Sequence, residues 1–411
     1  MAVMAAADVD GSAVVRERLE AFAAELLGES MNRPVQVVNG GLYLRGLLED
    51  GPRKSLEPLV ARLGGAAEYQ SMQQFLTDSP WDPALVVRAV AERVAAMIEV
   101  RAWVLDDTGF PKDGKHSPGV KRQYSGTLGK IGNCQIGVSV HAVGANGTVP
   151  LGWALYLPQD WCEDPERRWR AKIPADVAFK TKPELAVELV ERATGWGIPV
   201  APVLGDQAYG DDSQLRERLD AADLEYVLSV GPKATVFAPE TVFAVPERNG
   251  TVGRSRRRLR PDRAPESIAE LIARLGPEAA QTVTFRDGGD GRPVTSRFVF
   301  TRVRTLKQWT NGATQQPREE WLIAEWPDGR DEPTDYWLSN LPADTDPERL
   351  ARLARLRWTI ELDYKQLKGH LGLDHYEGRS WLGWHHHTAL VTAAHGFLTL
   401  ERQIPNRPRP A

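Results

Sequence analysis

Cysteine is scarce in this sequence, which has only Cys134 and Cys162 among its 411 residues. Two cysteines are too few for a disulfide framework, and they do not stand at the spacing of a metal-binding motif. We therefore interpret both as small buried residues.

Long apolar runs and a targeting segment are missing as well. The longest apolar candidate, residues 84–98, is interrupted by charged side chains, so the sequence predicts no membrane-spanning helix. Near the N-terminus, Asp8 and Asp10 stand where a secretory signal would carry lysine or arginine. We therefore expect a cytoplasmic protein.

The chain also lacks a net positive charge, since its formal charge is −4 at pH 7. Phosphate contacts are made by lysine and arginine, so the net charge alone gives no indication of a polyanionic partner. Arginines are nevertheless dense between residues 254 and 263, and a second basic stretch runs from Lys112 to Lys130. Each stretch is either a solvated loop or a phosphate-binding surface.

The residue pattern divides the chain into five parts, and its 42% hydrophobic content allows two or three domains. Apolar spacing of three and four residues alternates along the chain with shorter strand-like runs. The predicted parts are a helical N-terminal domain (1–99), the first part of a mixed sheet with flanking helices (100–234), a β-rich insertion (235–344), returning helices (345–403) and a disordered tail (404–411).

Two aspartates lie at the ends of predicted strands. Asp106 comes after the strand predicted over residues 102–105, and Asp206 comes after the strand predicted over residues 200–204. Ligands gather beyond the carboxyl ends of strands in sheets flanked by helices, so both carboxylates are candidates for a common site. A lone aspartate at such a place can equally be a cap or a turn residue.

One unbroken helix is predicted from Asp346 to about His370, and it supplies a third acid. At about 100° per residue, one arc of this helix is apolar and a neighbouring arc is polar. The polar arc contains Arg357, Glu361, Tyr364 and Lys368. An exposed Arg357–Glu361 pair, worth about 0.3–0.5 kcal/mol, would account for two of these residues without any chemistry.

Together these motifs resemble the DDE transposases of bacterial insertion sequences, in particular the insertion-sequence 701 family. Asp106 matches the first acid within LDDTGFPKDGK, with Asp107 as the adjacent alternative; Asp206 matches the second within VLGDQAYGDD. Glu361 matches the third within RWTIELDYKQLKGHLG, where Arg357 and Lys368 keep the family's spacing. Ala354 stands where related transposases carry a tyrosine. The resemblance extends to YLRGLLEDGPRKSLEPL, QFLTDSPWD, GVKRQYSGTLGKIGNCQIGVSVH and HYEGRSWLGWHHHTAL.

The resemblance implies an α/β fold, with a ribonuclease H-like mixed sheet that is interrupted by the β-rich insertion and preceded by the helical domain. It implies an enzyme that hydrolyses phosphodiester bonds at element ends and transfers the 3′-hydroxyl into target DNA. Such displacements use two cations about 3.5–4 Å apart, and carboxylates suit Mg²⁺ or Mn²⁺. Asp106 would contact both ions, with Asp206 and Glu361 completing one each.

The implied partners are double-stranded DNA with terminal inverted repeats, target DNA and a second copy of the chain in a homodimeric synaptic complex. The helical N-terminal domain is expected to bind the DNA ends. Basic side chains would contact the phosphates. The predicted phosphate-binding residues are Lys121, Arg122, Arg254, Arg256, Arg257, Arg258, Arg260, Arg357 and Lys368.

Aromatic and histidine clusters admit further interpretations. The run Trp384-His385-His386-His387 could suggest zinc, but consecutive helical residues point in different directions and no cysteines accompany them. A structural or DNA-facing role is therefore favoured. In the insertion, a tryptophan could stack on a displaced base, with core packing as the alternative. The candidates are Trp309, Trp321, Trp326 and, above all, Trp337.

Two other functions remain open at this stage. A catalytically silent, transposase-derived DNA-binding protein would keep end recognition without cleavage, although the presence of all three acids argues against it. A glycosidase would use two carboxylates, but it would need neither metal ions nor arginine clusters.

Overall fold

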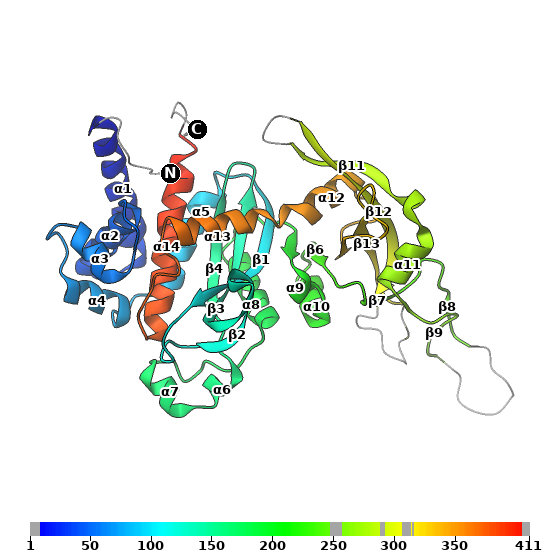
Figure 1. Cartoon of the computed structure of the whole chain (residues 1–411), viewed down its shortest axis with the longest axis horizontal. Coiled ribbons are helices and arrows are strands. Elements are labelled where there is room, and N and C mark those ends of the chain that lie inside the picture. The colour runs from blue at the N-terminus through cyan, green and yellow to red at the C-terminus, as the bar shows by residue number, and fades with distance from the viewer. Residues whose placement is uncertain (1–8, 247–256, 288–291, 306–313, 315, 405–411) are drawn as a thin grey trace. The chain divides into compact units, whose positions relative to one another are not determined.

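The structure, a computed structural model, describes residues 9–246, 257–287, 292–305, 314 and 316–404 (Figure 1). Contacts within the chain divide it into two compact units. The first unit comprises Met1–Val200 and Thr359–Ala411, and the second comprises Ala201–Trp358. The domain boundaries expected from the sequence, at residues 99, 234 and 344, stay a prediction.

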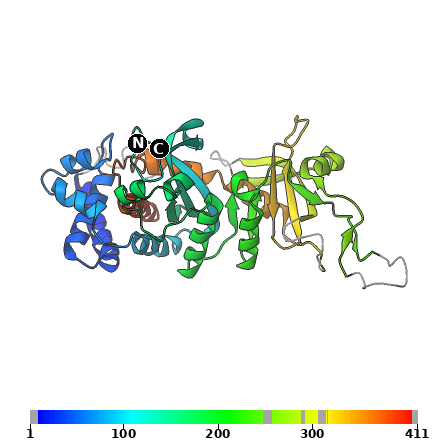
Figure 2. The ribbon, with the colours of Figure 1, turned by 90° about the horizontal axis from the view of Figure 1, so that it is seen from below.

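Helices α1–α5 begin the first unit, and α1–α4 lie together in both views (Figures 1 and 2). Their apolar side chains recur at helical spacing, which buries Leu26, Leu44 and Val90 completely. Asp82 caps α5 and is followed by Pro83 at the first helical position. The bounds are α1 (Val9–Ser30), α2 (Pro34–Leu48), α3 (Leu56–Arg62), α4 (Tyr69–Thr77) and α5 (Pro83–Ala95).

An antiparallel sheet forms the centre of the first unit. Its long strand β3 pairs with β1 along one edge, and with β2 and then β4 along the other. The strands are β1 (Val100–Pro111), β2 (Lys121–Ser125), β3 (Lys130–Gly144) and β4 (Thr148–Leu155), and the 3₁₀ turn η1 (Gly126–Leu128) joins β2 to β3.

Strand β1 is longer than the sequence predicts. The expected strand ends at Leu105, whereas β1 continues to Pro111, which stands opposite Cys134 of β3. The prediction that Asp106 follows the end of a strand is therefore wrong. Asp and Gly in DDTG favour a turn locally, but pairing with β3 satisfies the backbone of this segment, so it stays extended.

Helices cover both faces of this sheet. Successive strand residues point to opposite faces, and Ser139 contacts Tyr364 of α13 while Asp107 contacts Lys182 at the start of α8. Helix α14 is buried along most of its length. The remaining elements of the first unit are α6 (Gln159–Cys162), α7 (Pro165–Arg170), α8 (Lys182–Gly195), α13 (Thr359–Gly369) and α14 (Trp381–Glu401).

The second unit contains a mixed sheet in the strand order β10-β7-β12-β13-β14-β6-β5, with β11 also paired to β12. Strands β5 and β6 are parallel, and the other pairs are antiparallel. The strands are β5 (Val203–Gly205), β6 (Tyr226–Ser229), β7 (Thr235–Phe237), β10 (Glu266–Ser267), β11 (Gln281–Asp287), β12 (Pro293–Thr305), β13 (Glu319–Glu325) and β14 (Asp335–Ser339).

Helix α11 and a small ribbon complete the second unit. Leu271 and Ile272 of α11 are fully buried in a core with Val299 of β12 and Leu322 of β13. The other elements are α9 (Gln207–Gly210), α10 (Ser213–Ala221), β8 (Phe243–Ala244), β9 (Arg260–Pro261), α11 (Ile268–Leu275), η2 (Pro277–Ala279) and α12 (Pro347–Leu356). Sheets flanked by helices place the chain in the predicted α/β class, in agreement with a ribonuclease H-like fold.

The segment from Asp346 to His370 is two helices and not one. Helix α12 ends at Leu356 and α13 begins at Thr359, with Arg357 and Trp358 between them. The prediction of one unbroken helix is wrong. The Trp358 ring lies 4.8 Å from the guanidinium of Arg286 in the second unit, whereas Ile360 is completely buried in the first. No described helix has both the length and the apolarity to cross a membrane.

Candidate active site

Asp106 points to the face of the first unit's sheet that α13 covers. It stands directly opposite Ser139, and residues opposite each other in an antiparallel pair project to the same face. The Ser139 hydroxyl is hydrogen-bonded to the Tyr364 hydroxyl at 2.8 Å. Burial, followed by the negative charge of Asp106, raises the pKa of Tyr364 well above its ordinary value. The Asp106 carboxylate therefore lies on the sheet face toward Tyr364 of α13, and its charge acts on the Tyr364 hydroxyl.

Asp107 points the other way and is already engaged. Its Oδ2 accepts a hydrogen bond from the Lys182 ammonium at 2.9 Å, and its side chain is 17% exposed. The Asp107 backbone N–H donates to Oδ1 of Asp106 at 2.7 Å. Alternation along β1 thus separates the two acids, which supports Asp106 over Asp107 as the first acid.

Glu361 lies in the first turn of α13 and is exposed. Residues three and seven positions later, Tyr364 and Lys368, share its side of the helix. Tyr364 reaches Ser139, and the Lys368 ammonium donates to the Gly109 carbonyl of β1 at 2.7 Å. The side of α13 that carries Glu361 therefore faces β1, so the first unit brings Asp106 and Glu361 to the same face of its sheet.

Arg357 does not belong to this arc. It is the C-terminal cap of α12, whereas Glu361 is part of α13, so the break removes the common helical face that the sequence suggested. Grouping Arg357 with Glu361, Tyr364 and Lys368 on one helix was wrong for Arg357.

Lys368 is held by protein atoms on two sides. Besides the Gly109 carbonyl, its ammonium donates to Oγ1 of Thr127 at 2.9 Å. Burial lowers its pKa from 10.5 to about 8. An ammonium has three N–H donors, so one is left for a further acceptor.

A buried polar cluster fixes α13 to the sheet, and the sequence motifs gave no indication of it. Asp363 accepts hydrogen bonds from His141 of β3 at 2.9 Å and from Thr148 of β4 at 2.6 Å. Burial alone would raise the pKa of Asp363, but the hydrogen bond from His141 leads the interactions that hold it below its ordinary value. The alternating pattern of HAV and TVP could have predicted that His141 points into the interior, but it could not identify Asp363 as its partner.

Asp206 belongs to the second unit and caps a short helix. It follows β5 directly, as the sequence predicts, and its Oδ1 accepts a hydrogen bond from the Ala208 backbone N–H at 2.9 Å. Its side chain is partly exposed. The cap explains locally why an aspartate stands at this position.

The predicted metal ligands agree with a hard divalent cation in their chemistry. Asp106, Asp206 and Glu361 offer carboxylate oxygens alone, the donors that Mg²⁺ and Mn²⁺ prefer. Within the described part of the chain, no three His, Cys, Asp or Glu side chains gather in a group that could hold a metal ion. The assignment of these three acids to a metal site is therefore a proposal.

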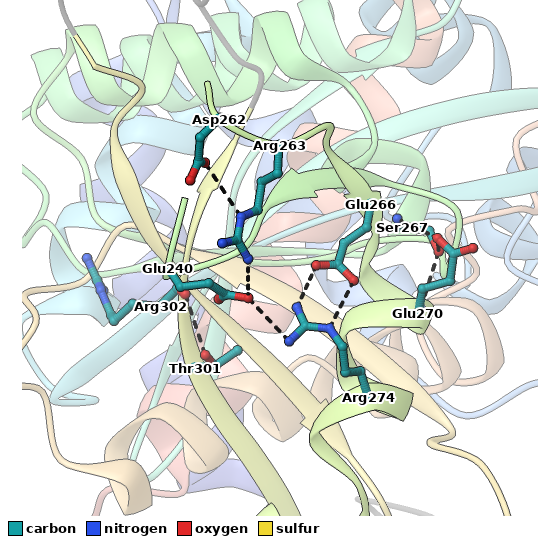
Figure 3. Close-up of polar contacts among 9 residues, drawn as sticks. All are labelled: Glu240, Asp262, Arg263, Glu266, Ser267, Glu270, Arg274, Thr301 and Arg302. Atoms are coloured by element: carbon teal, nitrogen blue, oxygen red, sulfur yellow. Dashed lines mark hydrogen bonds and ion pairs between the residues drawn. The ribbon is translucent and has the colours of Figure 1, made fainter. Parts of the chain in front are cut away.

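The arginine run of the insertion is only partly described. Arg254 and Arg256 lie outside the described residues, while Arg257, Arg258 and Arg260 are exposed. Arg263, at the end of the run, is bound within the fold. Its guanidinium contacts Glu240 at 2.8 Å, and Glu240 also contacts Arg274 of α11 at 3.3 Å (Figure 3). Arg263 therefore has a structural role beside the β8–β9 ribbon, where Glu240 holds its guanidinium.

The tryptophans of the insertion differ in exposure. Trp337 is 5% exposed and packs 6.5 Å from Phe298, so its ring offers no open face in this structure. Trp326 is equally buried, and Trp309 lies outside the described residues. Trp321 is partly exposed, with the Arg302 guanidinium 4.8 Å from its ring.

The three consecutive histidines of α14 hold three different neighbours. Nδ1 of His385 is 3.0 Å from the Trp381 carbonyl, and His386 lies between the Leu76 and Trp81 carbonyls at 2.8 and 2.9 Å. His387 contacts the Tyr43 hydroxyl at 2.9 Å. The bonds of His386 and His387 fasten α14 to the N-terminal helices, whereas the contact of His385 lies within α14. Of the two roles that the sequence favoured, structural or DNA-facing, these contacts support the structural one.

With the sheets and the acids in place, comparison with known families defines the class. A family model of DDE superfamily endonucleases matches residues 27–292, more than half of the chain, and the matched range includes Asp106 and Asp206. The chain belongs to the DDE superfamily endonucleases. Glu361 lies beyond the matched residues.

A transposase is among its relatives. The probable transposase for insertion sequence element IS701 from Microchaete diplosiphon is 32% identical over 188 residues. The aligned part is 45% of this chain and 46% of the relative, so the chain spans about half the length of the curated relative that it matches.

Proposed function

We propose that this protein is a DNA transposase of an insertion sequence. It would hydrolyse phosphodiester bonds at the element ends in a reaction that needs divalent metal ions, and then join the liberated 3′-hydroxyl to target DNA. Membership in the DDE superfamily endonucleases supports the reaction class. One observation supports the site. Asp106 lies on the sheet face that α13 covers, and the side of α13 that carries Glu361 is turned toward that face.

Three acids are proposed to bind two Mg²⁺ or Mn²⁺ ions. Bound there, the ions would neutralise charge on the phosphate and lower the pKa of the attacking water. Asp106 would contact both ions, and Asp206 and Glu361 one each. Asp206 enters the proposal through its position in VLGDQAYGDD and through the family match.

The neighbours of these acids would keep them in place. Tyr364 holds α13 to β3 as a neutral phenol, since its raised pKa excludes the phenolate. The remaining N–H of Lys368 would bind a phosphate of the cut strand. Arg357 is proposed to contact a second phosphate, for which its planar fork is suited.

The remaining partners are proposed from the resemblance. They are double-stranded DNA with terminal inverted repeats, target DNA and a second copy of the chain. Phosphate contacts are proposed for the exposed basic side chains Lys121, Arg122, Arg257, Arg258 and Arg260, and for Arg254 and Arg256, which lie outside the described residues.

Nicking of a supercoiled plasmid that carries element ends tests the proposal. The protein should nick in MgCl₂ or MnCl₂ and not in EDTA. Asp106→Asn, Asp206→Asn and Glu361→Gln should each abolish nicking and still bind end DNA. Asp107→Asn is the matched control, because it changes the adjacent carboxylate on the opposite face and should keep nicking.

Each contrary result has a defined meaning. Nicking by Asp106→Asn together with loss in Asp107→Asn would move the first acid to Asp107. End binding by the wild type without nicking under any metal condition would replace the proposal by the catalytically silent DNA-binding protein.

A further inference from the structure

We propose that the ribbon formed by β2 and the start of β3, residues 121–134, contacts DNA beside the cleaved bond. Tyr124 and Ile131 pack against an exposed base and its sugar, and Arg122 binds a neighbouring phosphate. The proposal rests on the proposed function, and it names a surface and a mode of contact that the acids do not supply.

The outer face of this ribbon carries an exposed apolar pair. Tyr124 and Ile131 stand directly opposite each other in the antiparallel pairing, so their side chains lie side by side. Tyr124 is 64% exposed and Ile131 is 60% exposed. Arg122, two residues before Tyr124 in β2, projects to the same face and is also exposed. Strand β2 is an edge strand, because its ladder partner among the described strands is β3 (Figure 1).

The inner face fixes the ribbon to the catalytic strand. Ser125 is 1% exposed and lies so close to Gly109 of β1 that a Cβ on Gly109 would stand 2.0 Å from its hydroxyl oxygen. Thr127, in the turn, accepts hydrogen bonds from the Gly109 backbone N–H at 3.3 Å and from Lys368 at 2.9 Å. The ribbon is therefore anchored to Gly109, three residues beyond Asp106 in β1. It is also anchored to Lys368 of α13, the helix that carries Glu361.

The charge of this region selects a polyanion as the partner. Between Asp113 and Asp160 the sequence contains no aspartate or glutamate, but it contains Lys121, Arg122 and Lys130 in the ribbon. Lys121 pairs with Asp160 at 2.9 Å. A second copy of the same surface would bring like charges together, whereas DNA supplies phosphates for the cations and flat base faces for the apolar pair.

Fluorescence of 2-aminopurine tests this contact without cleavage. The base analogue is placed at each nucleotide next to the cleaved bond, and the DNA is bound by the Glu361→Gln protein, which keeps it intact. We expect a fluorescence change at one or two of these nucleotides. Adding Tyr124→Ser should remove the change and weaken binding about tenfold, whereas Tyr124→Phe should keep both, because the packing surface remains.

Salt dependence separates the apolar contact from the ionic one. Arg122→Gln should lower the slope of log affinity against log salt by about one phosphate contact, while Tyr124→Ser should leave the slope unchanged. Trp169→Ser is the matched control, since Trp169 is 79% exposed on α7, outside the ribbon and outside the helical N-terminal domain, and its loss should change neither quantity.

Unchanged fluorescence and affinity in both Tyr124→Ser and Ile131→Thr would overturn the proposal. Ile131→Thr keeps a β-branched side chain in the strand, so it remains informative if Tyr124→Ser lowers the melting temperature. A change of oligomeric state by sedimentation, with DNA binding intact, would also overturn it in favour of a protein interface. Because the readout is binding, it stays measurable even if the wild type proves unable to nick.

Discussion

Asp106 and Asp107 are adjacent in β1, but strand alternation gives them different neighbours. Asp107 is tied to Lys182, whereas Asp106 shares a face with Ser139 and Tyr364. From the sequence alone Asp106 matches the motif and Asp107 stays the adjacent alternative, because LDDTG does not reveal which face each helix covers. The distinction needs the partners on α8 and α13, which lie far along the chain.

The Asp107–Lys182 pair should contribute modestly to stability. Its side chains are 17% and 32% exposed, so solvent screens the pair and its loss should cost about 1 kcal/mol or less. Asp107→Asn and Lys182→Met are therefore expected to lower the free energy of unfolding in urea by similar small amounts. The double variant should lose less than the sum. Strict additivity would show that the two side chains do not interact in solution.

At the scale of elements, the regular segments were predictable and their ends were less so. The apolar spacing predicts a helix over residues 183–196, and the structure has α8 over Lys182–Gly195, with Thr181 as its N-cap. The break between α12 and α13 carries no glycine or proline, the usual signals of a helix end. It arises from the separate packing of Trp358 and Ile360, which sequence periodicity cannot show.

Helix α14 should make the first unit sensitive to mild acid. Burial lowers the pKa of His385, His387 and His395 from 6.5 to about 4. Between these values the unfolded chain binds more protons than the folded one, so stability falls as the pH falls from about 6.5 to 4. We expect the urea midpoint to decrease steadily over this window.

The contribution of α14 can be isolated with single substitutions. His385→Gln removes one titrating group from α14 and should make the dependence of unfolding free energy on pH shallower below 6.5. A substitution of the exposed His116 by glutamine is the control and should leave that slope unchanged. Equal slopes in the wild type and His385→Gln would contradict a buried neutral His385.

At the scale of the whole molecule, the net charge of −4 conceals its distribution. The acid-free stretch from residue 114 to residue 159 lies within the unit that holds Asp106 and Glu361. The sequence motifs predicted the α/β class, which the structure confirms, and they supplied the three acids that are proposed as metal ligands. They could not show that Trp337 is buried or that Lys368 already has two protein acceptors, because both properties depend on contacts between distant segments.

Metal ions should stabilise the folded protein if the acids bind them. A ligand that binds only the folded state adds RT ln(1 + [L]/Kd), about 2.7 kcal/mol at one hundred times Kd. Millimolar MnCl₂ should therefore raise the melting temperature of the wild type and of Asp107→Asn. Asp106→Asn and Glu361→Gln should lose most of this increase. An equal increase in all four proteins would place the bound metal elsewhere.

The order of the two units along the chain affects how the protein folds during its synthesis. Residues 201–358 form an uninterrupted unit, whereas the other unit is split and is completed only by α13 and α14. Helix α14 packs against α2, α4, α5 and β4, and nearly all of its residues are buried. Until the ribosome has translated α14, those partners present apolar surface to water. A newly made chain therefore cannot assemble the face that bears Asp106 and Glu361 before α13 and α14 have been translated, and a premature stop upstream of Trp381 leaves a nascent chain for chaperones and proteases to handle.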